Sequence, residues 1–211
     1  MRFFFVVVAL GFSLVVLEAV ERADDLRVQR WLGCDVPSRY VPKVDVVVRR
    51  ILLHKGRYQK VADESGVPWV VIAAIHNMES SGSFREHLHC GGTLKARTRW
   101  VPKGRPLVGT PPFSWEFSAK DALSYDGMGA KRWGYLFDFL WAVECYNGTG
   151  YWRYHRGTPT QYLYAATNQE RPGKYVSDGK WSSTARSKQI GCAAVWRRLE
   201  AKKAVCLRGL R

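Results

Sequence analysis

The stretch GVPWVVIAAIHNMESSGS, residues 66–83, decides the fold. Gly66 ends the segment before it, and Pro68 suits the first turn of a helix, where its missing N–H would have no partner. Residues 69–78 are almost all apolar. A helix that is apolar on every side is buried in the core. The stretch therefore predicts a central helix that starts after Pro68 and ends near Gly82.

Glu79 stands near the end of this helix, on the same face as Ile72 and Ile75. Burial disfavours the charged form of a carboxyl group, and the negative end of the helix dipole acts in the same direction. Both effects raise the pKa of Glu79. A glutamate that keeps its proton near neutral pH can serve as a general acid. The alternative is a helix-terminal glutamate that turns outward to water.

This pattern of GVP, apolar helix and Glu-Ser-Ser-Gly resembles the catalytic core of lysozyme-like glycosidases, in particular goose-type lysozymes, lytic transglycosylases and related phage and bacterial peptidoglycan hydrolases. Tyr146-Asn147-Gly148 matches a second element of that superfamily. The resemblance covers roughly residues 44–201. It implies that Glu79 is the catalytic acid, that Ser80, Tyr146 and Asn147 contact the substrate, and that the bond cleaved is the β-1,4 linkage between MurNAc and GlcNAc.

The second catalytic group is the weak point of the resemblance. Two-carboxylate glycosidases pair the acid with a base or nucleophile. In phage-type lysozymes this is an Asp on a hairpin, six residues before a Thr; Thr98 matches that threonine, but Gly92 stands where the Asp belongs. The role then falls to Glu144, Glu116 or Asp121. It falls to no carboxylate if the chain is a lytic transglycosylase, in which the 6-hydroxyl of the sugar closes onto C1.

Glu144 has two interpretations. It faces Glu79 across the cleft, or it pairs with an arginine such as Arg132 or Arg153.

Two aromatic residues complete the candidate site. The resemblance implies that Tyr162 or Tyr164 orients the acid, as an aromatic residue does in transglycosylases, and Tyr162 is preferred. Trp115 either lines the cleft or holds the neighbouring Pro-rich loop.

The net charge of the chain limits the classes of partner that we expect it to bind. Among 211 residues, 33 Lys and Arg face 18 Asp and Glu, a net charge of +15. Such a surface favours polyanions, namely nucleic acid, anionic lipid or an acidic cell wall. We do not expect nucleic acid, because no motif for it is present. The expected partners are peptidoglycan glycan strands and the anionic cell-wall surface, and the expected state is a monomer.

Residues 1–20 carry an apolar run shorter than the ~20 residues that span a bilayer. They predict a signal peptide, or a signal anchor that tethers the chain through residues 3–20. Either implies export to the periplasm or the cell exterior. Five cysteines there leave at least one thiol unpaired. No spacing indicates a metal, and no cofactor is expected.

The expected organisation is a linker over 21–43, a catalytic domain over 44–204 and a basic tail over 205–211. The spacing of apolar residues and caps predicts helices over 44–55, 57–64, 115–126, 133–146, 158–166 and 182–203. Gly91-Gly92 predicts a hairpin within 84–100, and residues 101–113 and 168–181 are expected to be loops. The fold class is α+β, mostly α: a lysozyme-like helical domain with one small β-hairpin sheet beside the cleft.

The expected function is that of a peptidoglycan hydrolase of the lysozyme type. The alternatives are a lytic transglycosylase and a cell-wall-binding protein that kept the fold without the chemistry.

Overall fold

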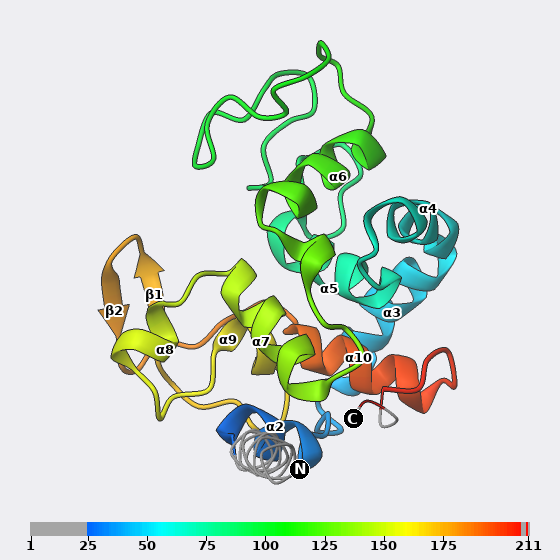
Figure 1. The fold of residues 1–211 in the computed structure, drawn as a ribbon. Helices are drawn as coiled ribbons and strands as arrows, with labels where there is room; N and C mark the ends of the chain where they lie inside the picture. The colour runs from blue at the N-terminus through cyan, green and yellow to red at the C-terminus, as the bar shows by residue number, and fades with distance from the viewer. Residues whose placement is uncertain (1–24, 208–209, 211) are drawn as a thin grey trace, which may run out of the picture.

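The computed structural model describes residues 25–207 and residue 210 (Figure 1). The expected signal peptide or anchor over 1–20 lies outside the described residues, as does part of the expected basic tail. Within residues 25–207, none of the helices combines the length and apolar character that crossing a bilayer requires.

The chain is mostly helical, with one small antiparallel sheet. In chain order the elements are α2 (Leu26–Leu32), α3 (Val41–Leu53), α4 (Lys55–Ser65), α5 (Trp69–Ser80), α6 (Trp115–Tyr125), η1 (Met128–Ala130), α7 (Leu136–Tyr146), α8 (Gly150–Tyr154), α9 (Gln161–Tyr164), β1 (Lys174–Ser177), β2 (Lys180–Ser182) and α10 (Cys192–Ala201).

Helix α5 lies at the centre of the fold, where it packs against α4 and α10 (Figure 1). Every residue from Val70 to Met78 is buried, as the apolar run predicts. Gly66 ends α4 in the left-handed conformation, with φ 72°, so the chain reverses there before α5 begins. The central helix is thus confirmed.

The helices flanking α5 also follow local signals. Helix α6 begins where predicted, because the Ser114 hydroxyl accepts the N–H of Phe117. Helix α3 starts at Val41, earlier than predicted, since Pro42 fits its first turn.

The expected linker over 21–43 differs from the structure from residue 25 onward. Asp25 caps α2, and Trp31 on that helix is buried against Trp196 of α10, with 6.0 Å between the ring centroids. The guanidinium of Arg197 lies 3.8 Å from the Trp31 ring and donates to the Trp31 carbonyl. Burial of one large aromatic side chain makes this segment part of the domain.

The sheet is not where the sequence analysis placed it. Residues 84–100 contain an isolated bridge between Glu86 and Thr93 and no strand, because the backbone there closes into tight turns. Strand β1 instead pairs with β2 across the two-residue turn Asp178-Gly179, in which Gly179 has φ 65°. Asp-Gly is a strong hairpin signal. The Gly, Pro and Lys content of residues 168–181 had indicated a loop.

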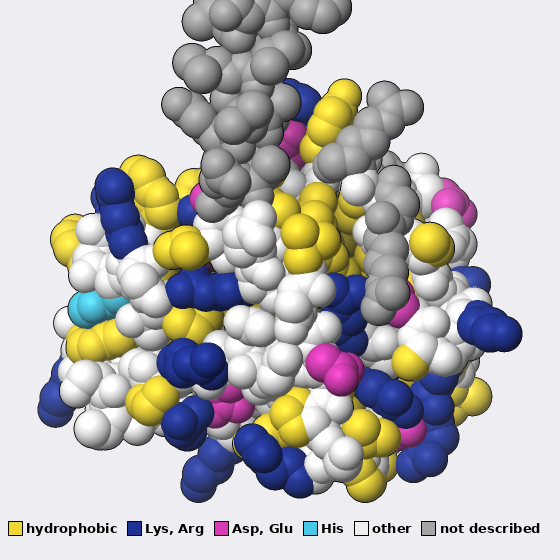
Figure 2. All heavy atoms as spheres, turned by 90° about the horizontal axis from the view of Figure 1, so that it is seen from below, with side chains coloured by type: hydrophobic (Ala, Val, Ile, Leu, Met, Phe, Trp, Pro, Cys, Tyr) yellow, Lys and Arg dark blue, Asp and Glu magenta, His cyan; other side chains and the backbone are white. Residues whose placement is uncertain are grey.

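The later helices are shorter than predicted. Helix α10 begins at Cys192 rather than near residue 182, because Ser182 ends β2 and residues 183–191 are irregular. Helix α9 ends before Ala166, which has φ 63°. Helix α8 was not predicted. All five cysteines lie in the described region and are free. Lys and Arg side chains are spread over the face seen in Figure 2 and outnumber the acidic ones there.

Candidate active site

The end of α5 places Glu79 through two tight backbone features. Ser81 adopts the left-handed conformation, with φ 53°, and its N–H bonds back to the carbonyl of His76. Gly91 approaches so closely that a Cβ there would lie 2.7 Å from the Glu79 carbonyl oxygen. The glycine predicted as a hairpin turn therefore serves to pack the following loop against the helix end.

Glu79 is partly buried and its carboxylate is held by one tyrosine. The Tyr162 hydroxyl donates to Glu79 Oε1 at 2.9 Å. Burial raises the pKa of Glu79 to about 7; the Tyr162 bond acts against this rise, and the charge of Asp126 adds to it. Desolvation dominates, so near neutral pH a large share of the molecules carry the proton.

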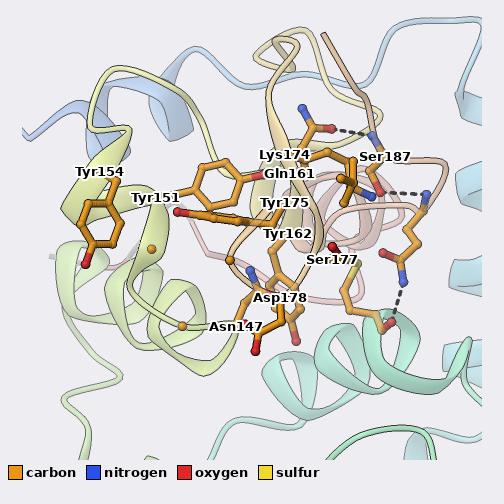
Figure 3. Close-up of a pocket in the computed structure, with 16 residues that line it drawn as sticks. Asn147, Tyr151, Tyr154, Gln161, Tyr162, Lys174, Tyr175, Ser177, Asp178 and Ser187 are labelled. Atoms are coloured by element: carbon orange, nitrogen blue, oxygen red, sulfur yellow. Dashed lines mark hydrogen bonds between the residues drawn. The ribbon is translucent and has the colours of Figure 1, made fainter. Parts of the chain in front are cut away.

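A cavity of about 560 Å³ adjoins this pair. Tyr162 and Met78 line it, whereas Glu79 does not line it itself and contacts a lining residue through the Tyr162 hydroxyl. Tyr162, Asn147, Asp178 and Tyr154 all line the cavity, and Figure 3 shows Tyr154 at the left of the view. The arrangement connects the acid to the cavity through Tyr162.

Aromatic rings form one side of the cavity. Tyr151 and Tyr175 line it with ring centroids 5.8 Å apart, and Trp181 packs 5.2 Å from each of them. Tyr154 also lines the cavity and is largely exposed. The exposed Tyr154 ring and the half-buried Tyr175 ring suit a ligand that has both apolar faces and hydroxyl groups, such as a sugar.

Hydrogen bonds to backbone fix the opposite side. The Gln189 amide donates to the Met78 carbonyl at 2.7 Å, and the Ser187 N–H donates to Gln161 Oε1 at 3.0 Å (Figure 3). The first bond satisfies a carbonyl at the end of α5. These glutamines were not predicted as site residues, because neither belongs to a sequence motif.

Of the predicted Tyr146-Asn147-Gly148 corner, Asn147 and Gly148 line the cavity. Tyr146 donates to the Leu88 carbonyl at 3.0 Å, and burial together with the nearby charge of Glu79 raises the pKa of its hydroxyl. The corner therefore lies near the acid, with Asn147 exposed to a ligand and Tyr146 used for packing.

Three predicted site residues have structural roles instead. Ser80 is buried and its hydroxyl donates to the His76 carbonyl, so it points back along α5. Trp115 is 1% exposed and packs 4.6 Å from the His76 ring, in the core rather than in the cleft. Thr98 is buried away from the cavity, where it accepts the Arg105 N–H at 2.9 Å.

The predicted second carboxylates are all engaged elsewhere. Glu144 pairs with Arg27 at 2.6 Å, not with Arg132 or Arg153, and lines a separate cavity of about 220 Å³.

Glu116 pairs with Arg57 at 2.6 Å. Asp121 receives two hydrogen bonds from Arg105 and one contact from His89. The structure brings none of these three carboxylates to the Glu79 cavity.

Two other carboxylates lie near the site, and sequence reasoning missed both. Among the described residues, Asp178, at the turn between β1 and β2, is the one acid that lines the cavity. Asp126, at the end of α6, lies near enough to Glu79 and Tyr146 to raise the pKa of each. Within the described residues no side-chain hydrogen bond or ion pair engages either one. The Asp-Gly turn was the signal that could have located Asp178.

In the part of the chain that the structure describes, no group of three or more His, Cys, Asp or Glu side chains is arranged to hold a metal. Comparisons with protein-family models, with curated proteins and with solved structures find no match.

Proposed function

We propose that this protein is a glycosidase that cleaves the β-1,4 bond between MurNAc and GlcNAc in peptidoglycan, with Glu79 as the general acid. One observation carries the proposal: the partly buried carboxyl of Glu79, with a pKa of about 7, is held by a tyrosine that lines a large open cavity. A carboxylic acid that stays protonated near neutral pH is what protonation of a leaving oxygen requires.

Two further features support a wall polysaccharide as the substrate. Tyr154 and Tyr175 offer ring faces to sugar rings, and the exposed Asn147 offers its amide to sugar hydroxyl or acetamido groups. The net charge of +15 attracts the chain to an acidic cell wall.

Hydrolysis begins with the transfer of a proton from Glu79 to the glycosidic oxygen. The bond from C1 to that oxygen breaks, and its electron pair goes to the leaving oxygen. Water then bonds to C1 and gives a proton to a carboxylate. Asp178 and Asp126 are the candidates for that carboxylate, because neither is engaged by a cation in the described region.

The second candidate function is that of a lytic transglycosylase. The observation that favours it is the hydrogen bond from Tyr162 to Glu79, together with the ion pairs that occupy Glu144, Glu116 and Asp121. In that reaction the sugar's own 6-hydroxyl attacks C1, and Glu79 accepts its proton.

Mass spectrometry of fragments released from purified cell walls tests both candidate functions, the hydrolase and the lytic transglycosylase. We expect reducing ends from hydrolysis, whereas anhydro ends indicate transglycosylation. Glu79→Gln should abolish release, and Glu116→Gln should not. An undiminished rate in Glu79→Gln refutes Glu79 as the acid, and a wild-type protein that sediments with walls without releasing fragments is a binding protein.

Asp178→Asn and Asp126→Asn distinguish the two carboxylates. If one of them activates water, its variant should lose most of the hydrolysis while the other keeps it. If both retain full activity and the products carry anhydro ends, no second carboxylate takes part.

A further inference from the structure

One loop projects at the end of the molecule opposite α2 (Figure 1). We call residues 97–112 the Trp100 loop. It lies between the turn after α5 and the start of α6, and it takes no part in the cavity beside Glu79.

The Trp100 loop exposes large apolar side chains. Trp100 is 73% exposed, Val101 86%, Leu107 66% and Val108 74%. Trp100 and Val101 are sequence neighbours on one arm of the loop, and Leu107 and Val108 are sequence neighbours on the other. Single exposed apolar residues are common on proteins, but four large ones on one loop indicate a surface that binds something.

Hydrogen bonds fix the conformation of this loop, and this conformation keeps the four apolar side chains exposed. The Thr98 N–H donates to the Arg105 carbonyl at 2.8 Å, and the Arg105 N–H donates to Thr98 Oγ1 at 2.9 Å. The Arg97 guanidinium donates to the Gly109 carbonyl at 2.7 Å. Arg105 is itself fixed by two bonds to Asp121 of α6. These bonds join the two arms and prevent the apolar pairs from folding back onto the core.

The charged residues of the Trp100 loop itself have one sign. No acidic residue occurs between Glu86 and Glu116. Arg99, Lys103 and the neighbouring Lys95 are exposed, and no side-chain partner engages them within the described residues. The surface therefore combines apolar tips with unpaired cations.

We propose that the Trp100 loop docks on an anionic lipid surface. Trp100 and the three aliphatic side chains enter the boundary between headgroups and acyl chains, where tryptophan is enriched in membrane proteins. Lys95, Arg99 and Lys103 pair with lipid phosphates. A glycan surface would meet the charge but offers nothing for valine and leucine to enter. The inference is independent of the chemistry at Glu79.

Hydrogen exchange with mass spectrometry on the full chain tests the proposal, because its readout is local. We expect slower exchange of amides in residues 97–112 with vesicles of phosphatidylglycerol and phosphatidylcholine. Vesicles of phosphatidylcholine alone should have little effect, and high salt should weaken the protection. Binding through any other segment would leave these amides unchanged.

Two double variants separate the contributions. Arg99→Ser with Lys103→Ser should weaken partitioning to anionic vesicles by roughly fivefold for each cation removed. Trp100→Ser with Val101→Ser should abolish the protection of the loop. The matched control is Leu53→Ser with Arg49→Ser on α3, which removes one exposed apolar and one exposed basic side chain elsewhere. It should change neither the partitioning to anionic vesicles nor the protection of residues 97–112.

The proposal is overturned if anionic vesicles leave residues 97–112 unprotected. It is also overturned if purified cell walls or a protein protect them and lipid does not, or if the control variant weakens the protection as much as the loop variants do.

Discussion

Glu79→Gln should make the folded protein more stable at alkaline pH while it removes the proposed acid. The carboxyl has an ordinary pKa of 4.5 and a folded-state pKa of about 7, chiefly because of burial. One pKa unit corresponds to 1.36 kcal/mol. Ionised Glu79 is therefore less favourable in the folded than in the unfolded chain by about 3 kcal/mol.

The sign of the pH dependence follows from proton binding. Between pH 4.5 and about 7 the folded chain binds this proton more tightly than the unfolded chain does, so stability falls as pH rises through this window. Above pH 7 Glu79 is ionised in the folded chain, which then carries the whole cost of about 3 kcal/mol. Glutamine carries no charge, and its Oε1 can still accept the Tyr162 hydroxyl. The variant should therefore gain up to about 3 kcal/mol at pH 8.5 and nothing near pH 4.5.

Urea unfolding followed by tryptophan fluorescence at several pH values measures this difference. Glu116→Gln is the control of opposite sign, because the ion pair with Arg57 lowers the pKa of Glu116. That pair stabilises the fold above the ordinary pKa of 4.5 and loses its effect as pH falls, so the control should lose up to about 1 kcal/mol at pH 8.5. Parallel pH profiles for wild type and Glu79→Gln would refute the assigned burial of Glu79.

Three further changes test other parts of the structure. Tyr162→Phe removes a hydrogen bond that opposes the rise in the pKa of Glu79, so the alkaline limb of the pH–activity profile should move to higher pH; an unchanged limb contradicts the contact. Arg27→Met leaves Glu144 buried without its partner and should cost about 3–5 kcal/mol in urea unfolding at neutral pH. A loss below about 1 kcal/mol would mean that Glu144 finds water or another cation. Trp31→Ala should cost about 3–5 kcal/mol in the same assay if α2 belongs to the domain, and almost nothing if that segment is a linker.

The sequence predicted the elements whose signals are local. The apolar run, Gly66 and Pro68 locate α5, and Ser114 locates the start of α6, because caps and periodicity act within a few residues. The spacing along α5 left two possibilities for Glu79, a buried carboxyl with a raised pKa or one turned outward to water, and the structure has the first.

Long-range pairings were beyond the sequence. Glu144 is 117 residues from Arg27, and with 33 Lys and Arg in the chain no pattern selects that partner. The position of the sheet was missed for a different reason: two short strands carry little apolar signal, and tertiary contacts override weak propensity.

The sequence by itself determined a central apolar helix that carries a carboxylate at its end, since hydrophobic spacing and backbone stops are local properties. Only the tertiary structure decided what surrounds that carboxylate. It brought Tyr162, 83 residues away in sequence, into a hydrogen bond with Glu79. It placed Glu144, Glu116 and Asp121 in ion pairs elsewhere. It also placed Asp178 at the cavity. The reason is physical: the environment that sets a pKa is made by side chains distant in sequence, and folding alone decides which of them meet.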